Sequence, residues 1–112
     1  MELLCCVVNG HRMVEAILTG FLDIGIHGAT VVDAKGMGEI ITTQIPIFAG
    51  FKSMFPVGGG HTYLLLSVIE DELIDKAMLV IEEASGSLEA PGTGIVFTVP
   101  VNRVRGMAGE LG

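Results

Sequence analysis

The chain of 112 residues is poor in basic, aromatic and cysteine residues, and it has no tryptophan. Its six lysines and arginines stand against 13 acidic residues, and the net charge of −7 argues against general nucleic-acid binding, which depends on basic surface. No apolar run approaches the roughly eighteen residues that a membrane-spanning helix needs. The first residues include no basic segment, so we expect no signal peptide and a cytoplasmic location.

The two cysteines, Cys5 and Cys6, are neighbours. Neighbouring side chains of a strand point to opposite faces, so we do not expect a disulfide between them. We interpret both as small buried thiols in a reducing compartment. The sequence has no Cys-X-X-Cys motif, and His11, His27 and His61 have no second ligand at metal-type spacing. No metal site is therefore predicted.

Motifs of catalysis are also missing from the sequence. It has no Gly-X-Ser-X-Gly, no P-loop and no pair of acids at a clear spacing, so we do not expect an enzyme.

The length indicates one domain. Half of the residues are hydrophobic and the mean hydropathy is +0.66, which is high for a soluble monomer. We expect the excess apolar surface to be buried between subunits of a homo-oligomer.

Hydrophobic periodicity predicts six elements in the order strand, helix, strand, strand, helix, strand. The expected strands are 2–8, 29–35, 62–69 and 95–99, and the expected helices are 11–24 and about 70–84. Glu70-Asp71-Glu72 are interpreted as the start of the second helix. The buried stripe expected on the first helix consists of Met13, Val14, Ile17, Leu18, Phe21 and Leu22. This order of elements predicts an α+β fold, the ferredoxin-like βαββαβ sandwich, with a four-stranded antiparallel sheet and both helices on one face. The open face of such a sheet would be apolar here, and oligomerisation is the obvious way to cover it.

The longest connection of the chain covers residues 36–60, and we interpret it as an interaction loop. A loop of roughly twenty residues is unusual in so small a domain. Its apolar side chains either pack on a neighbouring subunit or dock into a partner protein. The residues that we expect to contact a partner are Ile45, Ile47, Phe48, Phe51, Lys52, Met54 and Phe55.

Four short motifs occur in order along the chain. They are Gly25-Ile26-His27-Gly28-Ala29-Thr30-Val31, Lys35-Gly36-Met37-Gly38, Gly92-Thr93-Gly94, and a C-terminal group made of Val99-Pro100-Val101, Arg103-Val104-Arg105 and Gly109-Glu110. In this order and at these spacings the motifs resemble those of the PII signalling proteins of nitrogen regulation. The resemblance covers essentially the whole chain.

The resemblance implies a cytoplasmic homotrimer of single-domain subunits (1–112), with a T-loop-like segment at 36–60 and a B-loop-like segment at 85–94. An adenine nucleotide (ATP, ADP or AMP) would bind between subunits as an effector, with no permanent cofactor. Glycine amides can approach phosphates closely, and paired arginines can grip them. The protein would signal to a target protein, such as a membrane transporter or a metabolic enzyme. The implied nucleotide-binding residues are Thr30, Gly36, Met37, Gly38, Gly92, Thr93, Gly94, Arg103 and Arg105.

The chain departs from the family pattern in both loops. Ile95 stands where the family has its B-loop lysine, and Glu39-Ile40 stands where it has an Arg-Gln pair that helps to hold magnesium and 2-oxoglutarate. The segment 36–60 contains no tyrosine, which excludes the usual uridylylation.

Two other interpretations of the protein stay open. One is a trimeric metal- or small-ion-handling protein with the fold of the copper-tolerance trimers, and the other is a ligand-free scaffold that acts only through protein contacts.

Overall fold

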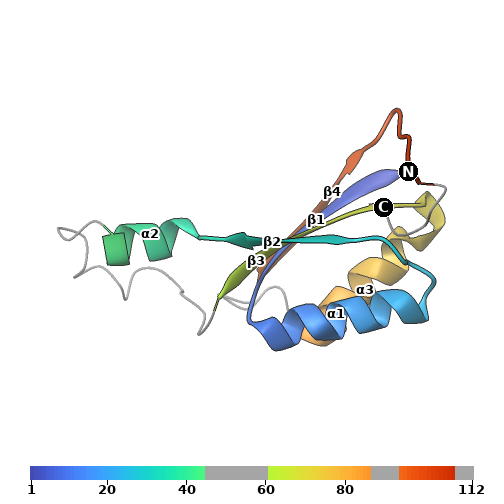
Figure 1. Cartoon of the computed structure of the whole chain (residues 1–112). Helices are drawn as coiled ribbons and strands as arrows, with labels where there is room; N and C mark the ends of the chain where they lie inside the picture. The colour runs from blue at the N-terminus through green and yellow to red at the C-terminus, as the bar shows by residue number, and fades with distance from the viewer. Residues whose placement is uncertain (45–60, 87–93, 108–112) are drawn as a thin grey trace.

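A computed structural model describes residues 1–44, 61–86 and 94–107 of the chain. Figure 1 shows that α1 and α3 cover one face of a sheet, whereas α2 projects away from it. The fold is α+β with a four-stranded antiparallel sheet, as expected, and it is compatible with the ferredoxin-like arrangement. The elements are β1 (Glu2–Asn9), α1 (His11–Asp23), β2 (Thr30–Ala34), α2 (Met37–Gln44), β3 (Thr62–Ile69), the 3₁₀ turn η2 (Asp71–Leu73), α3 (Ile74–Ser85) and β4 (Gly94–Pro100).

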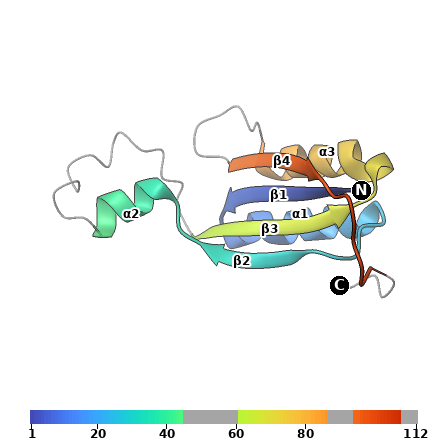
Figure 2. The ribbon, with the colours of Figure 1, turned by 90° about the horizontal axis from the view of Figure 1, so that it is seen from above.

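The sheet has the strand order β2-β3-β1-β4, and all three neighbouring pairs are antiparallel. Figure 2 shows the four strands side by side, with α1 and α3 behind them. In the register of the sheet, Cys6 lies opposite Leu65 of β3 and Val96 of β4. Residues that lie opposite one another share a face, so this register separates a helix-covered face from an open face.

The hydrophobic core lies between the helices and the covered face of the sheet. Gly20 lies where the two helices approach each other, because a Cβ atom added there would be 2.5 Å from Val80 Cγ1 of α3. The glycine lowers the helix propensity of α1 but permits this close contact. The buried core residues of the helices are Val14, Ile17 and Phe21 in α1 and Ile74, Ala77 and Ile81 in α3, and those of the central strands are Leu4, Cys6, Val8, Leu65 and Ile69.

The open face of the sheet is apolar as well, and no strand residue on it is charged. Its exposed part lies on the edge strands, where Ile95 is 56% exposed, Phe97 46%, Val99 42% and Val32 41%. Partly buried apolar residues fill its centre. They are Leu3 and Val7 of β1 and Leu64, Leu66 and Val68 of β3.

The prediction of an irregular loop after β2 was wrong for its first residues, because Met37–Gln44 form the helix α2. The amide of Ile40 donates a hydrogen bond to the carbonyl of Gly36, 3.1 Å away, at the start of this helix. Glu39 lies in the first turn, where the helix dipole favours a negative charge. The glycines and β-branched residues around this segment have low helix propensity, which hid the helix in the sequence. All seven residues expected to contact a partner lie outside the described residues.

The other predicted elements are confirmed to within one residue at each end, apart from the first residues of the second helix, which form η2. Cys5 and Cys6 lie on opposite faces of β1, as expected, and both thiols are free. Leu22 was expected in the buried stripe of α1, but its side chain is 61% exposed. It follows Phe21 by one residue, which turns it about 100° away from the core-facing side of the helix. Among the described residues, no helix is long and apolar enough to cross a membrane.

Candidate functional site

Three hollows surround the connection between α1 and β2, and Gly28 lines all three. Gly25 has a positive φ of 92°, which turns the chain sharply after the helix. The amide of Ile26 then donates a hydrogen bond to the carbonyl of Phe21 at 2.8 Å, and the Ile26 side chain is buried. The connection is therefore anchored in the core at Ile26, and the two residues that follow border the hollows.

Ser67 supports the same connection from the sheet. Its Oγ donates a hydrogen bond of 2.5 Å to the carbonyl oxygen of Gly28, and its side chain is 3% exposed. A buried hydroxyl without a partner would be costly, so this contact explains a serine in the otherwise apolar covered face of β3. The hydrogen bond holds Gly28 against the end of the sheet.

One hollow lies at the end of the open face, and we call it the arginine hollow because Arg105 lines it together with Thr30. Its volume is about 270 Å³. The C-terminal segment 101–107 forms its outer wall, and Figure 2 shows this segment running across the ends of β1, β3 and β2. The amide of Val101 donates to the carbonyl of Met1 at 3.1 Å, which ties the start of this segment to β1. The apolar walls are Leu3, Leu66, Val68, Val104 and Met107.

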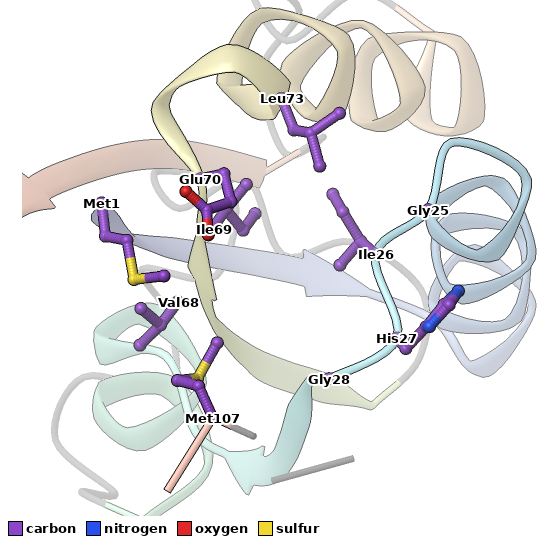
Figure 3. Close-up of a pocket in the computed structure, with 10 residues that line it drawn as sticks. All are labelled: Met1, Gly25, Ile26, His27, Gly28, Val68, Ile69, Glu70, Leu73 and Met107. Carbon is purple, nitrogen blue, oxygen red and sulfur yellow. The ribbon is translucent and has the colours of Figure 1, made fainter. Parts of the chain in front are cut away.

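A second hollow of about 290 Å³ adjoins the arginine hollow, and we call it the methionine hollow. The two share Gly28, Val68 and Met107 as lining residues. Figure 3 shows the side chains of Met1 and Met107 on either side of Val68, with Glu70 nearby. The methionine hollow therefore combines apolar walls with one carboxylate.

The N-terminal amine of Met1 lies beside the methionine hollow, 3.0 Å from Oδ1 of Asp71. The hydrogen bond that this amine donates to Asp71 raises the pKa of the amine above its ordinary value, and the charges of Glu70 and Glu2 act in the same direction. The acidic start of the second helix was interpreted from sequence as a helix terminus. In the structure its carboxylates also face the amino end of β1.

The predicted nucleotide-binding residues fall into two groups at opposite ends of the sheet. Thr30 and Arg105 lie together in the arginine hollow, and Arg103 is exposed on the same C-terminal segment. The second group lies beyond the far end of β2 or at the start of β4, and consists of Gly36, Met37, Gly38 and Gly94. Gly92 and Thr93 lie outside the described residues. One copy of the chain does not bring the two groups together.

A cluster of histidines and carboxylates at the far end of the sheet was missed from the sequence. His61 Nε2 lies 3.4 Å from Asp33 Oδ1, and His11 Nε2 lies 3.0 Å from Glu15 Oε1. The Tyr63 ring lies between the two imidazoles, with centroids 5.0 Å from His61 and 6.1 Å from His11. The residues come from α1, β2 and the start of β3, so only the strand register could have indicated the cluster.

Neither the histidine cluster nor any other group of three or more His, Cys, Asp or Glu in the described ranges could hold a metal ion. The buried thiol of Cys6 is equally unsuited to chemistry, because burial raises its pKa to about 11 and keeps it protonated near neutral pH. The arginine hollow is therefore the site whose residues are best suited to bind a ligand.

A comparison with known proteins found no family model and no curated protein that matches the chain. The resemblance to the PII proteins accordingly stays a prediction based on the four motifs. The function has to be argued from the residues that line the arginine hollow and from the surface around it.

Proposed function

We propose that the protein is a PII-like signalling protein that binds an adenine nucleotide in the arginine hollow. The observation that carries this proposal is the presence of Thr30 and Arg105 in one hollow although they are far apart in the sequence. A guanidinium binds phosphate oxygens through two parallel hydrogen bonds, and a hydroxyl can pair with the polar edge of a base. The apolar side chains between them suit the faces of a flat ring.

The charge distribution also supports an anionic ligand. The chain has a net charge of −7, yet no ion pair within the described ranges uses Arg103 or Arg105. In an acidic protein, two guanidinium groups on one segment remain available for a ligand phosphate. The two residues are separated by one position in an extended segment, so their side chains can reach the same side.

The open face supports the second part of the proposal, which is a cytoplasmic homotrimer. This face is uncharged and apolar, while the exposed carboxylates lie elsewhere, for example on Glu70, Asp75 and Glu82. Copies that met through their acidic helices would repel one another, whereas apolar faces of this kind favour association. The arginine hollow lies at one end of the open face, so a neighbouring copy could contribute residues such as Gly38 or Gly94.

We propose that the segment 36–60 transmits the signal to a target protein such as a membrane transporter or a metabolic enzyme. The helix α2 begins at Met37, directly after Gly36 and three residues beyond the end of β2. A ligand that contacted Gly36 or Gly38 of a neighbouring copy would bias the position of α2. It would do so only to the extent that its affinity differs between the positions that α2 can adopt.

Isothermal titration calorimetry with ATP, ADP and AMP tests nucleotide binding. We expect at least one of them to bind, and the substitution Arg105→Ala to weaken its affinity by about tenfold or more, as for the loss of a charged hydrogen bond. Arg12→Ala removes the same charge from the exposed side of α1 and should leave the affinity unchanged. Absence of binding at millimolar nucleotide in a confirmed trimer would refute the proposal, and a metal-dependent rise in Tm would then favour the ion-handling alternative.

The signalling role has a separate test. Deletion of residues 45–57 should leave the trimer and its nucleotide affinity intact, because the described strands and Thr30 and Arg105 of the arginine hollow all remain in the shortened chain. The same deletion should abolish nucleotide-dependent capture of the target protein from a cell lysate. An unchanged set of captured proteins would contradict a signalling role for this segment.

A further inference from the structure

Among the described residues, side-chain positive charge near the arginine hollow is confined to the C-terminal segment, and the N-terminal amine of Met1 beside the adjoining hollow is paired with Asp71. Arg105 lines the hollow, and Arg103 precedes it by two residues and is exposed. The other basic residues lie elsewhere: Arg12 on α1 and Lys76 on α3, both behind the sheet, Lys35 beyond the far end of β2, and Lys52 outside the described residues. Within the described ranges of one copy, Arg105 is therefore the only side-chain cation that lines this hollow, and Arg103 lies two residues before it on the same segment.

Negative charge borders the hollow on the side of the methionine hollow. The two hollows share Gly28, Val68 and Met107, and Glu70 lines the methionine hollow. Glu70 is exposed, and the carboxylates of Asp71 and Glu72 follow it directly. The carboxylate of Asp71 is paired with the N-terminal amine of Met1, 3.0 Å away, so a chain of phosphates that extended from Arg105 toward the methionine hollow would approach Glu70 and be repelled.

The opposite direction along the open face offers no cation among the residues that the structure describes. There the wall consists of apolar strand residues such as Leu64, Val7 and Phe97. A phosphate placed against them would lose hydration without gaining a charged partner, which is unfavourable. The hollow is also small, because its volume of about 270 Å³ lies below the range of roughly 300–1,000 Å³ typical of sites for drug-sized ligands.

On the basis of the nucleotide site proposed above, we infer that its ligand carries a single phosphate group, as a nucleoside monophosphate does. A terminal phosphate monoester carries about −1.5 to −2 charges at pH 7, which Arg103 and Arg105 together balance. A triphosphate brings further negative charges that no other described side chain at the hollow offsets. The hollow therefore discriminates among adenine nucleotides by the number of their phosphates, in favour of AMP.

Magnesium is the usual means of neutralising a triphosphate, and it needs only one or two carboxylates in addition to the phosphates. Glu70 is the carboxylate that lies near enough to line the adjoining hollow. AMP should therefore bind more tightly than ATP whether or not magnesium is present. Binding has to be measured both with Mg²⁺ and with a chelator.

Calorimetric titration of the full chain with AMP, ADP, ATP and adenosine tests the inference. We expect AMP to bind at least tenfold more tightly than ATP in both buffers, and adenosine to bind more weakly than AMP because it lacks the phosphate. Binding of ADP or ATP as tight as that of AMP in either buffer would overturn the inference but leave the proposed function intact. Absence of binding by every nucleotide would refute the proposed function itself.

Two charge substitutions sharpen the test. Glu70→Gln removes the carboxylate next to the hollow, so ATP should gain at least threefold in affinity relative to AMP. Glu72→Gln is the matched control, since it removes the same charge from an exposed position that lines neither hollow. Arg103→Ala should lower the affinity for AMP and leave that for adenosine unchanged. An equal ATP-to-AMP ratio in the Glu70 and Glu72 variants, or an equal loss for AMP and adenosine in the Arg103 variant, would contradict the assigned roles.

Discussion

The two faces of the sheet consist of alternate residues of the same strands, but only one face is covered. Cys6 and Leu65 are fully buried beneath the helices, whereas Phe97 on the open face is 46% exposed. An antiparallel sheet that is complete as a single copy usually has polar residues on its uncovered face. Here both faces are apolar. The comparison indicates that the covered face holds the folded chain together, whereas the open face borders the arginine hollow and remains available for the assembly proposed above.

The strongest test of this comparison sets Leu65→Ala against its neighbour Leu66→Ala. Leu65 is 0% exposed in the core, so its truncation should lower the free energy of unfolding by about 2–5 kcal/mol through lost burial and a residual cavity. Leu66 lies on the open face, and its truncation should cost clearly less at protein concentrations where the chain is monomeric. Urea denaturation followed by circular dichroism measures both. Equal losses would show that the two faces contribute equally to folding.

A charge on the open face tests its role in assembly. Phe97→Asp should dissociate the proposed oligomer, because an unpaired carboxylate buried between copies costs several kcal/mol. The helical circular dichroism should persist, since Phe97 lies outside the core. Leu22→Asp places the same charge on the outer side of α1, where the side chain is 61% exposed, and should leave the oligomer intact. Light scattering coupled to size exclusion measures the mass, and an oligomer that survives Phe97→Asp would contradict the assignment.

The adjacent cysteines offer a pH-dependent test. Burial raises the pKa of Cys6 from 9.0 to about 11, so above pH 9 the unfolded chain loses this proton before the folded chain does. The folded state then binds more protons, and stability should fall as pH rises from 9 to about 11, by about 1.4 kcal/mol per pH unit. Cys6→Val should remove this slope, and Cys5→Val should retain it. A slope that disappears in the Cys5 variant instead would contradict the burial of Cys6.

The smallest expected effect concerns the one polar side chain of the described core. Ser67→Ala deprives the Gly28 carbonyl of its hydrogen bond and should lower the free energy of unfolding by about 1 kcal/mol. Ser85→Ala removes a hydroxyl that donates to Ile81 within the last turn of α3, and should have little effect. Thermal denaturation measures the change in Tm that each of the two substitutions causes. Equal changes in Tm would show that Ser67 does not specifically support the connection at Gly28.

The six main elements could be predicted because each depends on a local pattern of apolar residues. The strand 62–69 has the predicted bounds, and the helix α1 ends one residue earlier than expected. The helix α2 could not be predicted, since Gly38 and its β-branched residues mask a helical pattern that is only eight residues long. Leu22 was misplaced because the stripe of α1 is narrower than the run of apolar residues in the sequence.

The candidate site was predicted only in part. Thr30 and Arg105 could be named from their motifs, but their meeting in one hollow depends on the path of the segment 101–107 across the sheet. The contribution of Glu70 to the adjoining hollow could not be predicted, because in sequence it reads as the start of a helix. The pairing of His61 with Asp33 was hidden for a similar reason, as it follows from the register of β2 on β3.

The sequence by itself determined the order of strands and helices, the acidic charge and the two apolar faces of the strands, because these follow from side-chain chemistry and from local periodicity. Only the tertiary structure decided which face the helices cover and where the C-terminal segment lies. It thereby brought Arg105 and Thr30 to one hollow, and Glu70 and Met107 to the adjoining one. Such contacts arise between residues that are distant along the chain, and a local pattern carries no information about them.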